Sequence, residues 1–292
     1  MKQYHEALEH ILEHGVETED RTGIGTISYF GMQMRYNLQD GFPAVTTKKL
    51  AWKSVVAELL WFLEGSTDER RLAELTYQKY RRDILDKKTI WTANADNQGV
   101  ALGYLNNDMT KILGPVYGSQ WRHFDRRDGV DQIKRIIKQI RNESDSRRII
   151  LSAWNPNQID LMALPPCHVL SQFRVMNGKL SCQLYQRSVD MGLGAVFNVA
   201  SYALLTHIIA RECNLDVGDF IHTVGDAHIY KNHIPAIEEQ LKRKSTDLPE
   251  LFIDSSFNLL NGLDFRFSID TVNLFRLEGY NPHPTIKMEM AI

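Results

Sequence analysis

The sequence predicts an α+β fold, and three observations lead to that class. Helix-like and strand-like segments are mixed along the chain without the regular alternation that is typical of a parallel sheet. Asn177-Gly178 separates two alternating segments, which is the strongest short-range indication of a β-hairpin. The 292 residues are 43% hydrophobic, which is enough for a sizeable core. Because neither an internal repeat nor a low-complexity linker divides the chain, we expect a single domain over residues 1–292.

Helices are predicted where apolar residues recur three and four positions apart. In the first helix, Tyr4, Leu8 and Ile11 share a face, and Gly15 follows as a stop signal. Further helices are expected at about residues 50–63, 130–140, 200–211 and 232–242. Glu58 lies inside the second of these, among apolar neighbours.

Strands are predicted where apolar residues alternate or form short buried runs. The first covers residues 26–36, and Gly31 lies where the alternation changes face, which suggests a bulge. The hairpin follows from the turn at 177–178. The expected strands lie at residues 149–153, 169–176, 179–186, 220–224 and 286–292.

Composition excludes several classes of protein. Thirty-four basic and 36 acidic side chains give a net charge of −2, so no global positive field is available to hold nucleic acid or an anionic membrane. There is no apolar run near the ~20 residues that a membrane span needs, and the first ten residues are too polar for a signal peptide. Three cysteines without a CxxC pair argue against a disulfide scaffold or a thiolate zinc site. We therefore expect a reducing, cytoplasmic location and no metal.

Cys167 follows two prolines, which indicates that it marks the start of a strand. With a two-residue turn at 177–178, Cys167 would face Ser188, and Arg187 and Asp190 would lie within a residue or two of that level. A guanidinium or hydroxyl beside the thiol would stabilise a thiolate. The alternative is that Cys167 is a small buried hydrophobe. His168 is a poor base for a Cys-His hydrolase because neighbours on a strand point to opposite faces.

Arginines next to Ser, Thr or Gly suggest a phosphate site, since guanidinium and hydroxyl donors suit a phosphate dianion. The alternative for each is a solvated surface arginine. The residues concerned are Arg21, Arg147, Arg148 and Arg187, with Ser188.

Three further side chains offer polar groups to a small ligand. The carboxamide of Asn198 pairs one donor with one acceptor, which matches the O4/N3–H edge of uracil, although Asn is also a common helix N-cap. His228 and Tyr230 would share a face of an extended segment and could grip a sugar hydroxyl; alternatively they are core aromatic residues with satisfied polar tips.

Taken together, ordered segments across nearly the whole chain resemble the thymidylate synthase family. So many blocks at compatible spacing are far more specific than one short motif. The blocks lie at residues 19–23, 58–63, 114–122, 146–148, 163–168, 185–190, 197–202 and 225–230, and at the extreme C-terminus.

The resemblance implies a single-domain fold with a large mixed β-sheet packed by helices, and a homodimer that packs sheet to sheet. It also implies reductive methylation of dUMP by 5,10-methylenetetrahydrofolate, which gives dTMP and dihydrofolate. Cys167 would attack C6 of the uracil, and Glu58, with a raised pKa and help from Tyr117, would manage proton transfer. The catalytic set that the resemblance implies is Cys167, Glu58, Tyr117, Arg187 and Asp190.

The same resemblance implies the ligand contacts. Arg21, Arg187 and Ser188 would bind the phosphate together with Arg147 and Arg148 of the partner subunit, while Asn198 would read the uracil edge. The full substrate set is Arg21, Arg147, Arg148, Gln186, Arg187, Ser188, Asp190, Asn198, His228 and Tyr230. The folate set is Lys48, Ile90, Trp91, Asp190, Leu193, Gly194, Phe197, Ala291 and Ile292.

Three positions depart from the usual pattern of the family. Thr92 stands where many members have Asp, Val196 stands where Pro is usual, and Val189 replaces a small residue or Cys. The first two would border the folate pocket, and Val196 would remove a rigid turn there. They leave open a deoxyuridylate hydroxymethylase, in which water replaces the hydride in the last step. A dCMP-specific member is disfavoured because position 198 is not Asp.

Two alternative functions, from other classes of protein, remain. A nucleic-acid-binding protein is disfavoured by the near-neutral charge and by the lack of a recognised motif. A Cys-His hydrolase would need a base other than His168, such as His228.

Overall fold

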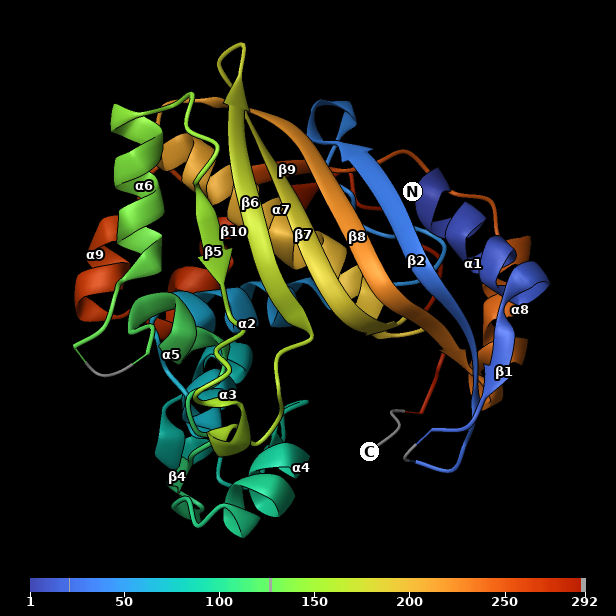
Figure 1. The fold of residues 1–292 in the computed structure, drawn as a ribbon, viewed down its shortest axis with the longest axis horizontal. Coiled ribbons are helices and arrows are strands. Elements are labelled where there is room, and N and C mark those ends of the chain that lie inside the picture. Colours follow the sequence, from blue (N-terminus) through green and yellow to red (C-terminus); the bar gives the residue numbers. More distant parts are fainter. Residues whose placement is uncertain (21, 126–127, 290–292) are drawn as a thin grey trace. The chain divides into compact units, whose positions relative to one another are not determined.

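The computed structural model describes residues 1–20, 22–125 and 128–289 (Figure 1). These form two compact units, each made of separate stretches of sequence. The first unit comprises Met1–Ala51, Ser171–Phe252 and Leu277–Ile292, and the second comprises Trp52–Leu170 and Ile253–Arg276. The single domain over residues 1–292 stays a prediction.

The first unit is built on long, neighbouring strands (Figure 1). The strand order in the six-stranded sheet is β1-β2-β8-β7-β6-β5. The sheet is mixed, since β2 pairs with β8 in antiparallel orientation whereas β7 pairs with β8 in parallel. The bounds are β1 Val16–Thr18, β2 Thr26–Asn37, β6 His168–Met176, β7 Lys179–Asp190 and β8 Asp216–Tyr230.

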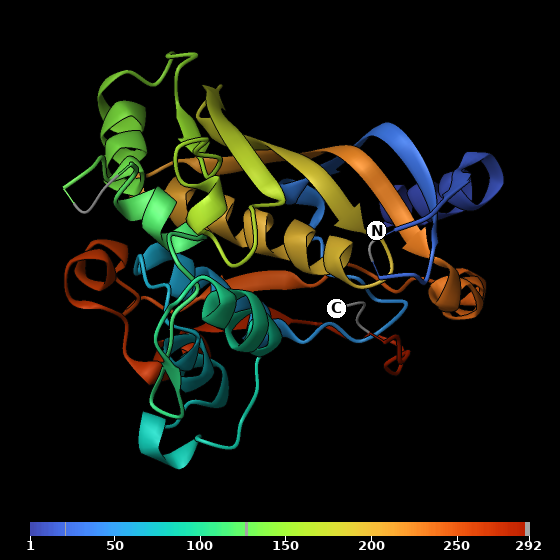
Figure 2. The ribbon, with the colours of Figure 1, turned by 60° about the horizontal axis from the view of Figure 1, so that its bottom comes forward.

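Helix α7 (Gly194–Glu212) connects the parallel strands β7 and β8 and packs along one face of both (Figure 2). Thirteen of its side chains are buried around its whole circumference, as expected of a helix enclosed in a core. Helices α1 (Lys2–His14) and α8 (Ile234–Lys242) complete the unit, together with the 3₁₀ turns η1 Leu38–Asp40 and η5 Lys231–His233.

The second unit is mainly helical. Helix α2 packs against α3 and α5, and α6 packs against α5 and β5. The helices are α2 Trp52–Leu63, α3 Glu69–Tyr77, α4 Thr92–Asn94, α5 Tyr117–Arg122, α6 Gln132–Asn142 and α9 Leu259–Phe265. The short strands of this unit are β3 Asn106–Asn107, β4 Thr110–Lys111 and β5 Ile150–Ser152, of which β5 is an edge strand of the six-stranded sheet. Strands β9 Glu250–Ile253 and β10 Phe275–Glu278 pair with each other, and the division between the two units falls within both of them. The irregular turns are η2 Arg81–Asp83, η3 Ala95–Gly99, η4 Ile159–Leu161 and η6 Ile269–Leu274.

The predicted α+β class and mixed sheet are confirmed, and so is the hairpin. Asn177 and Gly178 have φ of 51° and 74°, the positive values that a two-residue hairpin turn of this type requires. The predicted helices all form, although α7 begins six residues before the expected position 200.

Three strand predictions were wrong. The register between β2 and β8 is unbroken on both sides of Gly31, so no bulge forms; Gly31 instead has φ of 85°, which glycine adopts without steric cost. Strand β8 begins at Asp216 and not at Phe220, because pairing with β7 extends the strand through residues 216–219, of which only Val217 is apolar. Residues 286–289 are not a strand; alternation of side chains alone does not make one without a partner strand.

Candidate functional site

Cys167 lies immediately before β6, as the prolines predicted, and its backbone is held by a tyrosine. The hydroxyl oxygen of Tyr117, the first residue of α5, accepts hydrogen bonds from the backbone N–H of Cys167 at 2.7 Å and of His168 at 3.3 Å. The His168 ring packs on Tyr117 with 5.0 Å between ring centroids. Two adjacent N–H groups thus converge on one phenol, which fixes the backbone that carries the thiol.

Burial keeps the phenol of Tyr117 neutral. It raises the pKa of Tyr117 well above 10, and the nearby Cys167 and Glu58 act in the same direction. The ring of Phe62 also packs on Tyr117, with 4.9 Å between ring centroids. Tyr117 therefore stays a hydroxyl at neutral pH and is available as a fixed donor and acceptor.

Glu58 is the acidic member of this group. It projects from α2, whose neighbouring residues Ala57 and Leu59 are buried. Burial raises the pKa of Glu58 to about 7, and the hydrogen bond from Trp91 Nε1 to Glu58 Oε1, at 2.7 Å, opposes the shift. The raised pKa that the sequence predicted is confirmed, and it suits a group that gives and takes protons near neutrality. We call Glu58, Trp91, Tyr117, Cys167 and His168 the Cys167 cluster.

In the first unit, Asn198 belongs to a chain of hydrogen bonds. Gln186 Nε2 on β7 donates to Asn198 Oδ1 at 3.0 Å. Gln186 Oε1 in turn accepts from His222 Nε2 on β8 at 2.8 Å, and both Gln186 and His222 are buried. Because both ends of the Gln186 amide are engaged, the orientation of the Asn198 carboxamide is set. We call these three residues the Asn198 chain.

Two earlier interpretations near Asn198 were wrong. Asn198 is the fifth residue of α7, and the N-cap of that helix is Leu193, so Asn198 is not a capping residue. Val196 lies in the first turn of the same helix and is 1% exposed. No rigid turn is therefore lost at position 196, which is helical. A Pro would be tolerated so near the start of a helix because its missing N–H is not needed there.

Asp190 ends β7 and holds the turn that precedes α7. Its Oδ1 accepts from the backbone N–H of Gly192 at 2.8 Å and of Leu193 at 3.3 Å. Lys48 Nζ donates to the Gly192 carbonyl, and His233 Nδ1 lies 3.7 Å from Asp190 Oδ1. Burial lowers the pKa of Lys48 to about 8, while Asp190 opposes that shift. Burial also lowers the pKa of His233, but the nearby Asp190 carboxylate and the hydrogen bond to the Glu289 carbonyl outweigh it, so the net shift is upward.

His228 and Tyr230 are close together, as their spacing on a strand predicted. Their rings meet edge to face with 5.2 Å between centroids. His228 also lies beside Asp226, and this contact holds the pKa of Asp226 below its usual value.

The remaining predicted residues are placed as follows. Arg147 and Arg148 are exposed between α6 and β5, while Arg187 and Ser188 are half-buried on β7. Trp91 is only 6% exposed, and Ile90 beside it is 59% exposed. Leu193, Gly194 and Phe197 are half-buried at the start of α7. Arg21, Ala291 and Ile292 lie outside the described residues. That Cys167 faces Ser188 stays a prediction.

Sequence reasoning missed His222 and a buried ion pair between Glu69 and Arg70, whose side chains are at most 1% exposed. A predicted strand register for β8 would have found His222, because His222 pairs with Leu184, two residues from Gln186. Nothing in the sequence distinguishes Glu69 and Arg70 from residues on a solvated helix face.

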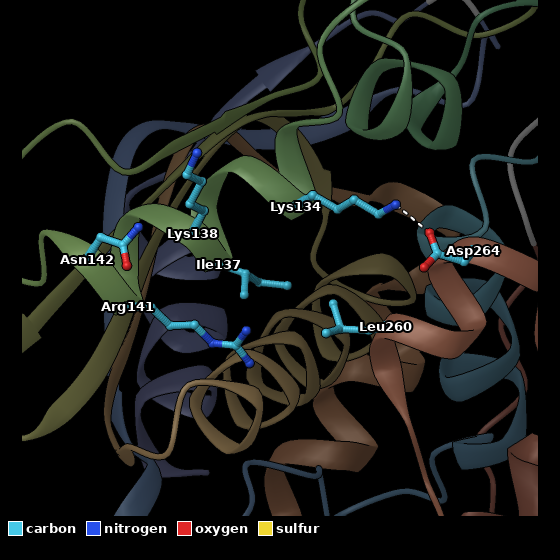
Figure 3. A pocket seen from close by; sticks show the side chains of 7 residues that line it. All are labelled: Lys134, Ile137, Lys138, Arg141, Asn142, Leu260 and Asp264. Atoms are coloured by element: carbon cyan, nitrogen blue, oxygen red, sulfur yellow. Dashed lines mark hydrogen bonds and ion pairs between the residues drawn. The ribbon is translucent and has the colours of Figure 1, made fainter.

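A cavity of about 460 Å³ lies between α6 and α9, and none of the predicted site residues lines it (Figure 3). It is lined by Lys134, Ile137, Lys138, Arg141, Asn142, Leu260 and Asp264. Within the described ranges, no group of three or more His, Cys, Asp or Glu side chains could hold a metal ion. No helix formed by residues 1–20, 22–125 or 128–289 is long and apolar enough to cross a membrane.

Comparison with known proteins identifies the family. The family model described as thymidylate synthase matches residues 2–292. The chain belongs to the thymidylate synthase family. It is 50% identical to the human thymidylate synthase over 99% of this chain and 90% of the relative. It is 48% identical to thymidylate synthase of varicella-zoster virus, strain Dumas, over 99% of this chain and 94% of the relative.

Proposed function

We propose that the chain carries out the reaction of its family, the methylation of dUMP to dTMP, with Cys167 as the nucleophile. The observation that carries this proposal is the Cys167 cluster. A cysteine backbone anchored on Tyr117 shares the cluster with a carboxyl group whose pKa is about 7. Such a pair provides a nucleophile and a proton carrier in one place.

In the proposed reaction the Cys167 thiolate adds to C6 of the uracil ring. The electron pair moves to C5, which then attacks the methylene group of 5,10-methylenetetrahydrofolate and forms the new C–C bond. A proton leaves C5, the folate departs as an amine and returns a hydride to the methylene carbon, and the C6–S bond breaks. Glu58 would accept and return protons through ordered water, helped by Tyr117.

Asn198 would select the base. Its Oδ1 already accepts from Gln186 and retains a second lone pair for the N3–H of uracil, while Nδ2 would donate to O4. The Asn198 chain supports this role because it leaves the carboxamide one orientation. Cytosine presents a donor at C4, which this orientation would not satisfy.

The sugar and the phosphate would be held by residues of β7 and β8 and by arginines. The edge-to-face pair His228–Tyr230 would grip the 3′-hydroxyl of the deoxyribose. The phosphate would bind Arg21, Arg187 and Ser188 of one subunit and Arg147 and Arg148 of its partner.

Folate would bind beside the start of α7. Asp190 would hydrogen-bond the pterin, and Leu193, Gly194 and Phe197 are the half-buried residues next to it. The remaining folate residues would be Ile90 and Trp91, Lys48 near the glutamate tail, and Ala291 and Ile292, which would close over the bound ligands and exclude water. We assign no metal to the reaction.

We propose a sheet-to-sheet homodimer. Alternate residues of β7 support it: Leu184 and Gln186 are buried, whereas Gln183 and Tyr185 are exposed. Gln183 and Gln33 both donate to the hydroxyl of Thr223, which makes a connected polar surface on that face of the sheet. The exposure of Arg147 and Arg148 also fits residues that serve a partner subunit. We further propose a cytoplasmic location, in keeping with three cysteines that are all present as thiols.

The hydroxymethylase alternative is not favoured. The matched family and both relatives are named thymidylate synthase. The two residues that raised this alternative are also buried: Thr92 is 4% exposed and Val196 is 1% exposed.

A product assay tests the proposed function. The protein is incubated with dUMP and methylenetetrahydrofolate, and both products are identified by mass. dTMP with dihydrofolate is expected, whereas 5-hydroxymethyl-dUMP with tetrahydrofolate would overturn the last step. Cys167→Ser should abolish turnover and leave dUMP binding measurable, while Cys213→Ser serves as the matched control. Retained turnover in Cys167→Ser would rule out the nucleophile assignment.

A further inference from the structure

The segment before Trp91 is folded around threonine hydroxyls. The backbone N–H of Thr89 donates to Thr92 Oγ1 at 2.8 Å, and the N–H of Trp91 donates to Thr89 Oγ1 at 3.2 Å. The N–H of Thr92 closes the turn on the Thr89 carbonyl at 3.2 Å. Trp91 therefore sits at the centre of a turn whose shape depends on two side chains.

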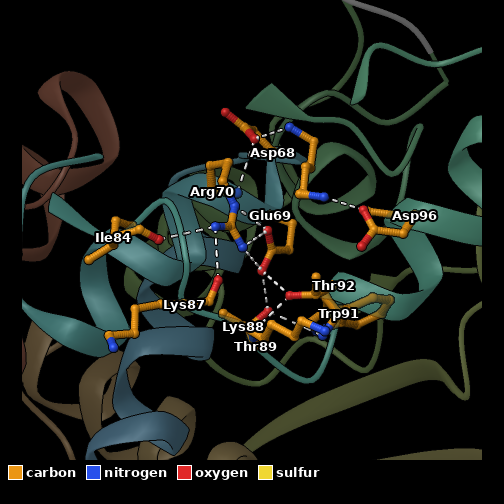
Figure 4. Close-up of polar contacts among 12 residues, drawn as sticks. Asp68, Glu69, Arg70, Ile84, Lys87, Lys88, Thr89, Trp91, Thr92 and Asp96 are labelled. Atoms are coloured by element: carbon orange, nitrogen blue, oxygen red, sulfur yellow. Dashed lines mark hydrogen bonds and ion pairs between the residues drawn. The ribbon is translucent and has the colours of Figure 1, made fainter. Parts of the chain in front are cut away.

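Both hydroxyls are in turn held by one carboxylate (Figure 4). Thr89 Oγ1 and Thr92 Oγ1 donate to the same oxygen, Glu69 Oε1, at 2.7 Å and 2.6 Å. Glu69 is fully buried and is paired with Arg70, whose Nε and Nη2 donate to it at 2.6 Å and 2.8 Å. A buried carboxylate with this many donors is a rigid acceptor.

The guanidinium of Arg70 extends the same attachment to the preceding loop. Its Nη1 donates to the carbonyls of Ile84 at 3.3 Å and Lys87 at 2.9 Å (Figure 4). One ion pair thus fixes the loop before Trp91 and the turn that contains it.

The other end of Trp91 meets the Cys167 cluster. Its indole Nε1 donates to Glu58 Oε1 at 2.7 Å, and its ring lies against Trp61 and Tyr117, at 5.8 Å and 6.0 Å between centroids. The direction of this N–H depends on where the backbone of Trp91 is placed. We propose that Thr92 and Glu69 are positioning residues that hold the indole N–H of Trp91 against the Glu58 carboxyl group.

This proposal rests on the proposed function in so far as Glu58 carries protons in the reaction. It also gives a role to Thr92, whose side chain is buried and whose hydroxyl donates to Glu69. Only a donor at position 92 can satisfy Glu69 in this way, and a carboxylate there would be repelled.

Other charged groups packed against α2 are engaged elsewhere. On α3, Arg71 pairs with Glu64 and Glu74. On α5, Arg122 donates to two backbone carbonyls and to Asp131, and on η6 the carboxyl of Asp270 is exposed. The hydrogen bond from Trp91 lowers the pKa of Glu58 against the effect of burial, and Tyr117 is a titratable group close enough to interact electrostatically with Glu58.

Two readouts test the proposal in Thr92→Val, which removes the hydroxyl and keeps the shape. The first is the indole Nε1–H resonance of Trp91, assigned with Trp91→Phe in protein that carries ¹⁵N-labelled tryptophan. The second is the pH profile of kcat. We expect the resonance to move, the limb that reports Glu58 to shift to higher pH, and kcat to fall about tenfold with little change in the KM for dUMP.

Matched variants separate positioning from general destabilisation. Thr92→Ser keeps a hydroxyl and should restore both readouts, and Thr110→Val, a half-buried threonine on β4, should leave both unchanged. Thr89→Val removes the second hydroxyl from a half-buried position, and it should move the same resonance if Thr92→Val does not fold.

An unchanged Trp91 resonance in folded Thr92→Val and Thr89→Val would overturn the proposal, whatever the loss of thermal stability. If the resonance moves while the pH profile of kcat stays unchanged, the positioning stands, and the proton-carrying role of Glu58 is the part that fails.

Discussion

Two acidic side chains on the neighbouring helices α2 and α3 have very different surroundings. Glu69 receives four hydrogen bonds, two from Arg70 and one each from Thr89 and Thr92. Among the residues that the structure describes, Glu58 receives one, from Trp91. Glu69 is therefore surrounded by a cation and hydrogen-bond donors, whereas Glu58, in the same unit, has a single neutral donor.

The difference shows what makes a carboxyl group useful for proton transfer. Removal from water disfavours the charged form, and only cationic or hydrogen-bonding partners offset that effect. Glu69 has both kinds of partner, so its charge fixes the surrounding backbone. Glu58 has one neutral donor, so its pKa rises to about 7 and its proton becomes exchangeable near neutral pH.

The largest expected effect comes from removing the titrating group. Glu58→Gln keeps the acceptor oxygen for Trp91 but cannot carry a proton, so kcat should fall by about 10²- to 10⁴-fold. The pH profile of kcat should lose the limb near 7 that the raised pKa of Glu58 leads us to expect for the wild-type chain. Steady-state kinetics across the neutral pH range measure both. Glu143→Gln, an exposed residue after α6, is the control, and a variant with wild-type kcat would show that Glu58 has no part in proton transfer.

The second effect concerns stability and falls on the other carboxylate. Arg70→Met leaves the Glu69 carboxylate buried without its cation, which should lower the free energy of unfolding by about 3–5 kcal/mol. The double variant Glu69→Gln, Arg70→Met removes both charges and should recover most of that loss, since the amide oxygen introduced at position 69 would still accept from the two threonines. Urea unfolding at one fixed protein concentration measures both. A double variant that is as unstable as the single one would show that burial of an unpaired charge is not the cause.

Local patterns predicted most of the fold. The apolar spacing of Tyr4, Leu8 and Ile11 indicated α1, and the Asn177-Gly178 turn indicated the hairpin of β6 and β7, because those signals act within a few residues. Strand β8 was predicted too short, since pairing with β2 and β7 keeps its polar ends extended although their sequence does not favour a strand. The strand prediction was wrong at residues 286–289 for the opposite reason: their apolar and polar side chains alternate, but they pair with no strand in the described structure.

Some residues of the candidate site could likewise be predicted from local sequence patterns, and others could not. Glu58 and Cys167 stood out because an acid in an apolar helix and a cysteine after two prolines are unusual in a local window. Glu69, Arg70 and His222 did not, because their roles depend on burial and on partners from other elements. A Glu-Arg pair at the start of a helix is typical of a solvated surface, and only the contacts with Thr89 and Thr92 reveal its place in the molecule.

The smallest effect is the contribution of Glu58 to stability as a function of pH. Because its folded-state pKa is raised from 4.5 to about 7, its stabilising contribution is full below pH 4.5 and is lost as the pH rises through about 7. At about 1.4 kcal/mol for each pKa unit, the wild-type chain should lose about 2–3 kcal/mol relative to Glu58→Gln between about pH 5 and about pH 8. Denaturant unfolding of both proteins across this range measures the difference, in which groups shared by the two chains cancel. A difference that does not change with pH would mean that Glu58 is solvated like an ordinary surface carboxyl, and the contrast with Glu69 would then reduce to the partners of Glu69 alone.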